Sequence, residues 1–265
     1  MASSAPAPRR GGNHSGQLQV MAARCASRIH GWFHGWDVYD RAVQHFFAHP
    51  SPNPPIFIEA GAYLGMSACF MSHLLSSKPH PARFVVLDTW GSLEHKRSSW
   101  LPEQDVRMIH ALGKGDMMLA WAHNVRDMGS WNHISAVRRL STLDAEALDM
   151  FANESVSFFY LDTSHGNHTT LELQAWWPRI AVGGWLCGDD WKRVQPWAAQ
   201  FAAERKLTVA PWPAEQWCMA KGDEAPAPKP SNWCVELETE GQERSRWQVR
   251  SVRWCGSHSQ GSPAR

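Results

Sequence analysis

The chain has 265 residues, of which 43% are hydrophobic, and a formal net charge of +1. This length and hydrophobic fraction support one large domain with a substantial core. The near-neutral charge argues against a nucleic-acid partner, whose many phosphates need a basic surface, and no apolar run approaches the ~18 residues of a membrane-spanning helix, so we expect no membrane partner either.

The N-terminal residues 1–17 are rich in Ser, Ala, Pro and Gly, and no acidic residue occurs before Asp37. This composition predicts a disordered tail, with an organelle transit peptide as the alternative. The six cysteines include no CxxC pair, which argues against a structural zinc site. Cys69 and Cys187 fall within apolar helix and strand patterns, where we expect free thiols and therefore a reducing, cytoplasmic compartment.

The first regular pattern is the helical spacing of residues 32–47, which prolines at positions 50–55 end. A short apolar run at 56–58 then predicts a buried strand. Gly61 and Gly65 bracket a turn after it, and a helix is expected from about Ser67 to Leu75. A glycine loop at a helix N-terminus presents free backbone N–H groups to an anionic or polar ligand, although many such loops are plain tight turns.

Short apolar runs then alternate with helical patterns. We expect strands at 84–88, 134–138, 156–161 and 184–188, and two last strands close together at 207–210 and 216–220. We expect helices at 116–125, 141–148 (capped by Ser141 or Thr142), 169–177 and around 194–202. Residues 93–115 are polar and are expected to be mobile or partly helical. This alternation predicts an α/β fold, a doubly wound and mainly parallel sheet whose final strands permit antiparallel pairing.

The pattern also predicts three segments along the chain. Residues 1–17 form the tail and 18–221 the α/β domain with its N-terminal helix. Residues 222–265 form a linker and a C-terminal extension, in which 233–237 and 247–254 could pair as a β-hairpin around a turn at 240–242.

Acidic residues stand at the carboxyl ends of the predicted strands. They are Glu59, Asp88, Asp162, Asp189 and Asp190. Ligands of doubly wound sheets bind at that edge, so these side chains are expected to converge there. Asp88, at the end of the second strand, is suited to accept hydrogen bonds from a ribose diol; the alternative is an ordinary loop or capping carboxylate.

Asp162, Asp189 and Asp190 are predicted to form a cluster that would be costly without a bound cation, and Mg²⁺ or another hard divalent ion suits oxygen ligands. The alternative is that Asp190 caps the next helix and only one aspartate faces the ligand. His165 follows Asp162 by three residues and is a candidate general base, although one histidine among fourteen could equally be a surface residue.

Four motifs carry a family resemblance when taken in order. They are Glu59–Ser67 (EAGAYLGMS), Leu87–Ser92 (LDTWGS), Tyr160–His165 (YLDTSH) and Gly183–Trp191 (GGWLCGDDW). Together they resemble the class I S-adenosylmethionine-dependent methyltransferases, in the branch related to macrocin-type and catechol-type O-methyltransferases. The similarity spans roughly residues 30–221 and implies a Rossmann-like, seven-stranded sheet whose last strand is antiparallel.

The resemblance also implies roles for individual residues. The cofactor site would contain Glu59, Gly61, Ala62, Tyr63, Gly65, Ser67, Asp88, Thr89, Trp90, Ser141 and Asp162. The metal site would contain Asp162, Asp189 and Asp190, with Glu94 as a further candidate, and catalysis would use His165 as the base together with Asp162.

The sequence therefore predicts S-adenosylmethionine-dependent, Mg²⁺-assisted O-methylation of a small hydroxylated molecule; a homo-oligomer is compatible with it. Methylation of carbon or nitrogen without a metal is an alternative. So is a nicotinamide-dependent oxidoreductase, although Gly61 and Gly65 do not match its GxGxxG fingerprint. The third is a binding module that holds the cofactor without turnover.

Overall fold

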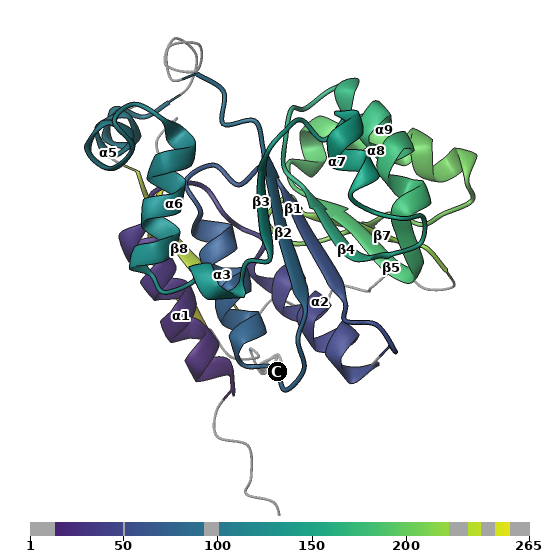
Figure 1. The fold of residues 1–265 in the computed structure, drawn as a ribbon, viewed down its shortest axis with the longest axis horizontal. Coiled ribbons are helices and arrows are strands. Elements are labelled where there is room, and N and C mark those ends of the chain that lie inside the picture. Colours follow the sequence, from purple (N-terminus) through teal and green to yellow (C-terminus); the bar gives the residue numbers. More distant parts are fainter. Residues whose placement is uncertain (1–13, 50, 93–100, 223–232, 240–246, 255–265) are drawn as a thin grey trace, which may run out of the picture.

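The computed structural model describes residues 14–49, 51–92, 101–222, 233–239 and 247–254. Within these residues, seven strands form one sheet in the order β3-β2-β1-β4-β5-β7-β6 (Figure 1). The strands are β1 (Ile56–Ala60), β2 (Arg83–Asp88), β3 (Ala136–Arg139), β4 (Val156–Leu161), β5 (Ile180–Gly188), β6 (Ala210–Pro211) and β7 (Trp217–Ala220). β7 runs antiparallel to β5 and β6, and the other pairs are parallel. The predicted fold class is confirmed.

Helices cover both faces of the sheet, and each face has its own hydrophobic core. One layer contains α1 (His14–Arg28), α2 (Trp36–Ala48), α3 (Met66–Ser76), α5 (Glu103–Gly113) and α6 (Met117–Asp127). The other contains α7 (Ala145–Asp149), α8 (His168–Trp176) and α9 (Trp191–Glu204). Along β1, Phe57 packs in the first core and Ile58 in the second, because successive strand residues point to opposite faces.

The order of the sheet determines where a ligand would bind. β1 and β4 are neighbours at its centre, and the chain runs outward from them in opposite directions. A doubly wound sheet opens a crevice at such a switch point, beside the carboxyl ends of the strands. The acidic residues lie at or just after the carboxyl ends of β1, β2, β4 and β5, which are adjacent strands. The structure therefore places them at one edge of the sheet.

Several element boundaries differ from the prediction. Helix α1 was not foreseen, and it begins at His14, inside the predicted tail. Asp144 rather than Ser141 or Thr142 is the N-cap of α7, because Ser141 lies in a turn in which its own N–H donates to Asp144 Oδ2. The strand predicted at 207–210 is only Ala210–Pro211, where the chain pairs with β7.

The C-terminal extension contains a two-stranded antiparallel sheet, β8 (Trp233–Thr239) and β9 (Trp247–Trp254). β9 contacts α1. Glu94, the linker prolines and the turn at 240–242 lie outside the described residues. In the part of the chain that the structure describes, no helix is both long and apolar enough to cross a bilayer.

The prediction of free thiols is wrong for Cys69 and Cys187. Disulfides join Cys25 to Cys69 and Cys187 to Cys218. The first links α1 to α3, and the second joins residues directly opposite each other on β5 and β7. The partners are 44 and 31 residues apart in sequence, so only tertiary packing reveals them. The inference of a reducing compartment, which rested on free thiols, loses this support.

Candidate active site

The glycine loop joins β1 to α3 beneath the carboxyl edge of the sheet. Gly61 and Gly65 have φ angles of +93° and +99°, a region that favours glycine. A Cβ atom on Gly61 would lie 1.6 Å from the carbonyl oxygen of Asp162. A Cβ on Gly65 would lie 2.9 to 3.0 Å from side-chain atoms of Val125 and Trp121. Packing within the protein therefore requires both glycines, even without a ligand against them.

Glu59 is the buried carboxyl group at the end of β1, with 1% of its surface exposed. Its Oε1 accepts a hydrogen bond from the Ser67 hydroxyl in the first turn of α3. Its Oε2 is buried and has no hydrogen-bond partner among the described residues. Burial raises the pKa of Glu59 to about 8, the hydrogen bond from Ser67 opposes this shift, and the charge of Asp88 adds to it. Such an acceptor suits a ligand that brings a hydrogen-bond donor or a positive charge.

A pocket opens beside this carboxyl group, and the empty space in it and at its solvent-open mouth is about 320 Å³. It lies between the segment 30–33, the glycine loop and the ends of β1 and β4. The lining includes the predicted cofactor residues Glu59, Gly61, Ala62, Tyr63, Ser67 and Asp162. Because α3 begins at Met66, the positive end of its dipole also faces this region.

Asp88 holds the glycine loop in place. Its Oδ2 accepts hydrogen bonds from the backbone N–H groups of Ala62 (2.9 Å) and Tyr63 (3.0 Å). Its Oδ1 accepts one from the N–H of Trp90 (2.6 Å). A carboxylate has about four acceptor positions, so one on Oδ1 is left for a ligand. The predicted bidentate bond to a ribose diol would require part of this arrangement to open.

The other residues predicted to contact a nucleoside lie near Asp88 but face different ways. Thr89 is exposed. The Trp90 side chain is fully buried; it packs against Trp121, and its indole N–H donates to the carbonyl oxygen of Tyr63. Ser141 follows β3, and its hydroxyl oxygen accepts from the N–H of Leu143 at 3.2 Å. Thr89 and Ser141 can therefore face a ligand, whereas the Trp90 indole supports the loop.

A second cluster of polar groups lies at the ends of β4 and β5. One ligand atom each from Asp162, His165 and Asp190 lies within 4.8 Å of the other two. His165 Nε2 is 2.7 Å from Asp190 Oδ2, and Asp190 is also the N-cap of α9. The oxygen and nitrogen atoms of this cluster are of the kind that bind divalent cations.

Asp189 is positioned differently from this cluster, although the sequence analysis grouped it with Asp162 and Asp190. Its Oδ1 accepts hydrogen bonds from the backbone N–H of Asp190 and from Gln216 Nε2, both at 2.7 Å. The Gln216 side-chain oxygen in turn accepts from the Tyr160 hydroxyl. Asp189 therefore anchors β7 to the sheet edge, and His165 takes its place among the converging ligand atoms.

The electrostatics of the cluster are those of crowded carboxyl groups. Burial raises the pKa of Asp162 well above its usual range, and the charges of Asp189 and Asp190 raise it further. Burial also raises the pKa of Asp189 to about 7. The hydrogen bond with His165 lowers the pKa of Asp190. A bound cation would relieve this mutual repulsion.

Two residues that no sequence pattern identifies, one in the pocket wall and one behind it, form a hydrogen-bonded group with Tyr63. The buried Asp105 on α5 accepts a hydrogen bond from the Tyr63 hydroxyl (2.5 Å), and its Oδ1 is 3.2 Å from His30 Nδ1. His30 itself lines the pocket. Asp105 lies in a segment that reads as polar and irregular in sequence, so no local pattern identifies it. In the sequence, His30 is marked as a candidate pocket residue only by its position next to Gly31 and Trp32.

One family model and several solved structures are similar to this chain. A family model described as a methyltransferase domain matches residues 58–191, about half of the chain. A comparison with curated proteins finds no match. Among solved structures, the O-methyltransferase NovP is 13% identical, with 70% of this chain and 78% of that chain covered and a TM-score of 0.49. A putative caffeoyl-CoA O-methyltransferase from Staphylococcus aureus is 10% identical, with 78% and 91% covered and a TM-score of 0.47.

The chain belongs to this methyltransferase family. Its fold and motifs are those of a class I S-adenosylmethionine-dependent methyltransferase, and the predicted enzyme class is confirmed. The family match selects a methyltransferase over the oxidoreductase alternative.

Proposed function

We propose that this enzyme transfers a methyl group from S-adenosylmethionine to a hydroxyl oxygen of a small molecule, with the help of a divalent cation. The observation that carries the proposal is the convergence of Asp162, His165 and Asp190 directly beside the pocket at Glu59 and Gly61. The pocket at Glu59 suits the positively charged amino group of the methionine moiety. The cluster of Asp162, His165 and Asp190 suits a metal cation and the substrate hydroxyl.

The described residues fit the cofactor. Glu59 Oε2 is a buried acceptor without a partner, and the amino group of the methionine moiety would supply the missing donor. The N-terminus of α3 would interact with the carboxylate of the same moiety. Asp88 would bond one ribose hydroxyl through the free position of its Oδ1, and Thr89 and Ser141 would lie along the nucleoside.

The donor set also fits a divalent cation. Asp162 and Asp190 would hold it through carboxylate oxygens, whereas Asp189, whose Oδ1 accepts from Gln216 and from the N–H of Asp190, lies outside the group of converging ligand atoms. A bound Mg²⁺ ion would act as a Lewis acid that orients the substrate hydroxyl and lowers its pKa. His165 is the proposed general base. Its Nε2 lies 2.7 Å from Asp190 Oδ2, so this contact must open before Nε2 can accept a proton from the substrate.

The test is transfer of isotope-labelled methyl from S-adenosylmethionine to a panel of small hydroxylated acceptors, with Mg²⁺ or with EDTA. We expect Mg²⁺-dependent release of S-adenosylhomocysteine and label on oxygen. Label on carbon or nitrogen would contradict O-methylation, and full activity in EDTA would contradict the cation. Tight cofactor binding without turnover on any acceptor would favour the non-catalytic alternative.

A further inference from the structure

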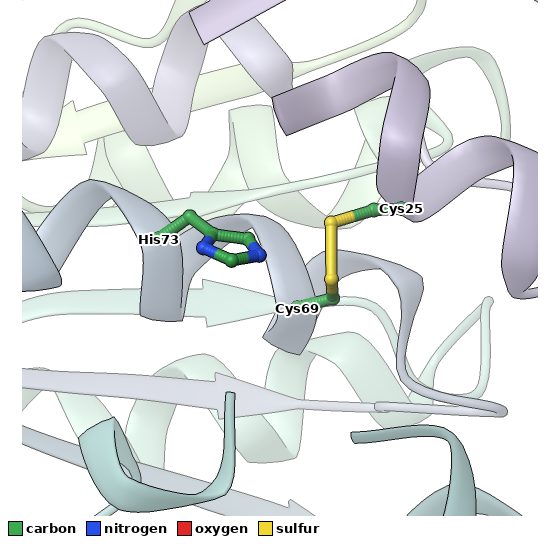
Figure 2. A group of neighbouring side chains, drawn as sticks. All are labelled: Cys25, Cys69 and His73. Atoms are coloured by element: carbon green, nitrogen blue, oxygen red, sulfur yellow. A yellow bond between two sulfur atoms is a disulfide. The ribbon is translucent and has the colours of Figure 1, made fainter. Parts of the chain in front are cut away.

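The disulfide between Cys25 and Cys69 joins α1 to α3, and neither cysteine lines the candidate active-site pocket. Both cysteines are completely buried, and their Cα atoms are 6.0 Å apart. His73 lies one helical turn after Cys69 on α3. One of its ring nitrogens and the two sulfur atoms all lie within 4.8 Å of one another. Figure 2 shows the His73 ring facing the disulfide.

One ring nitrogen of His73 is suited to bind a ligand. Its Nε2 atom is buried and has no hydrogen-bond partner among the described residues. A buried polar atom without a partner costs free energy, so this nitrogen suits a ligand that the structure does not contain. Burial lowers the pKa of His73, and the nearby charges of Arg24 and His133 lower it further. The ring is therefore neutral near pH 7, which is the form that binds metals.

We propose that Cys25, Cys69 and His73 form a binding site for Zn²⁺ when the disulfide is reduced. A Cys₂His set is typical of zinc, which prefers thiolate and imidazole ligands. With Zn–S bonds of about 2.3 Å and Zn–N bonds of about 2.0 Å in a tetrahedral site, the ligand atoms stand about 3.5 to 3.8 Å apart. To reach this zinc geometry, the two sulfur atoms must move apart to about 3.8 Å after the disulfide is reduced. A water molecule can supply the fourth ligand.

A zinc site of this kind does not require neighbouring cysteines. The absence of a CxxC pair excludes the common arrangement in which neighbouring cysteines supply the ligands. Here the ligands come from α1 and α3, and only Cys69 and His73 are close in sequence. Their spacing of four residues places them on the same side of one helix, as Figure 2 shows.

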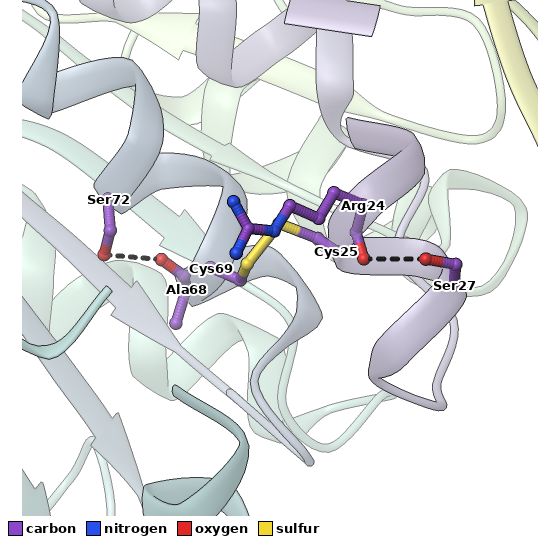
Figure 3. Close-up of a disulfide and its surroundings, with 6 residues drawn as sticks. All are labelled: Arg24, Cys25, Ser27, Ala68, Cys69 and Ser72. Atoms are coloured by element: carbon purple, nitrogen blue, oxygen red, sulfur yellow. Dashed lines mark hydrogen bonds between the residues drawn. A yellow bond between two sulfur atoms is a disulfide. The ribbon is translucent and has the colours of Figure 1, made fainter. Parts of the chain in front are cut away.

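Loading requires a balanced redox step. Two molecules of a thiol reductant transfer two electrons and two protons to the Cys25–Cys69 bond, giving two thiols and one oxidised reductant. Zn²⁺ then displaces both thiol protons. Two thiolates, one Zn²⁺ ion and a neutral imidazole sum to zero charge, which favours a buried site. Figure 3 shows the Arg24 side chain reaching toward the disulfide, where its positive charge can stabilise the thiolates during exchange.

The site is coupled to the methyltransferase pocket through α3. The N–H of Cys69 donates to the carbonyl oxygen of Gly65 at 2.9 Å, and Ser67 between them contacts Glu59. Either the disulfide or the metal would tie this first turn of α3 to α1. Reduction without metal would release that connection, so zinc is expected to restore thermal stability that reduction removes.

The experiment uses the full, untagged chain, reduced with a thiol reductant that is then removed without oxygen. We expect one equivalent of Co²⁺ to release two protons and to give a thiolate-to-cobalt charge-transfer band, which Zn²⁺ abolishes by displacing Co²⁺. The Asp162 cluster contains no sulfur and cannot produce this band.

Variants assign the ligands. Cys25→Ser and His73→Ala should each weaken Zn²⁺ binding at least about tenfold, while the matched thiol control Cys187→Ser should keep the band. Absence of the band in the reduced wild-type protein would overturn the proposal. Unchanged zinc affinity in His73→Ala would also overturn it. Because His73 is partly exposed, this variant should still fold and can test the site even if Cys25→Ser does not fold.

Discussion

Ser67 donates its hydroxyl hydrogen bond to one oxygen of the Glu59 carboxyl group, and the other oxygen has no partner among the described residues. This pair connects the end of the central strand to the first turn of α3. Because burial raises the pKa of Glu59 to about 8, the carboxyl group is neutral at pH 7 in the absence of a ligand. It becomes a carboxylate only when a positive partner or a higher pH favours ionisation.

The Glu59 pKa predicts how the stability of the ligand-free protein depends on pH. Between its ordinary value of 4.5 and about 8, the folded state binds more protons here than the unfolded state. The free energy of unfolding should therefore fall as the pH rises, by about 1.4 kcal/mol per pH unit for this one group. Glu59→Gln keeps the acceptor for Ser67 and removes the titration. Urea unfolding from pH 5 to 8 should show a shallower decline in this variant; equal slopes would contradict the assignment.

The same residue predicts a change in cofactor affinity. S-adenosylhomocysteine at a hundredfold excess over its Kd should stabilise the wild-type protein by about 2.7 kcal/mol, which corresponds to a rise in Tm of roughly 5 to 10 °C. In Glu59→Gln the charged hydrogen bond to the amino group is lost, and affinity should fall about 10- to 100-fold. Calorimetric titration at pH 8 measures this effect. A variant that binds as tightly as wild type would show that Glu59 does not contact the ligand.

Much of the fold follows from local patterns. Short apolar runs such as Val156–Leu161 are strands because both of their faces are covered by helices. The runs that form β1, β2, β4 and β5 end in or just before a carboxylic acid residue. Parallel neighbouring strands bring these ends to one edge of the sheet, so the shared position of Glu59, Asp88 and Asp162 follows from the alternation of strands and helices.

Contacts between distant segments could not be predicted in this way. Tyr63 donates a hydrogen bond to Asp105, which is 42 residues away in sequence. Gln216 donates one to Asp189, which is 27 residues away. Neither pair has a periodic signal, because each depends on how a loop packs over the sheet edge. The disulfide partners are hidden for the same reason. Asp189 looks equivalent to Asp190 in sequence, although in the structure its Oδ1 is bonded to Gln216 and its side chain lies outside the group formed by Asp162, His165 and Asp190.

The two aspartates predict different responses to substitution. Asp190→Asn removes a carboxylate from the cluster with Asp162 and His165, so half-maximal activity should require at least about tenfold more Mg²⁺. Asp189→Asn is the matched control, because its amide oxygen can still accept from Gln216, and a smaller effect is expected. Steady-state rates across a Mg²⁺ titration decide between them. Equal effects, or activity that EDTA does not change in either variant, would contradict the proposed ligand set.

The Cys187–Cys218 disulfide predicts a stability loss that is independent of the proposed zinc site. It joins opposite positions on β5 and β7 and closes a separation of 31 residues. In the chain-entropy model, the double variant Cys187→Ala with Cys218→Ala should lose about 2 to 4 kcal/mol of unfolding free energy under oxidising conditions. Urea unfolding measures the loss, and peptide mass spectrometry without reductant checks the pairing in the wild-type protein. Because this bond lies away from His73, Zn²⁺ should not restore the lost stability. Recovery with Zn²⁺ in this oxidised double variant would mean that metal binding does not depend on reduction of Cys25 and Cys69.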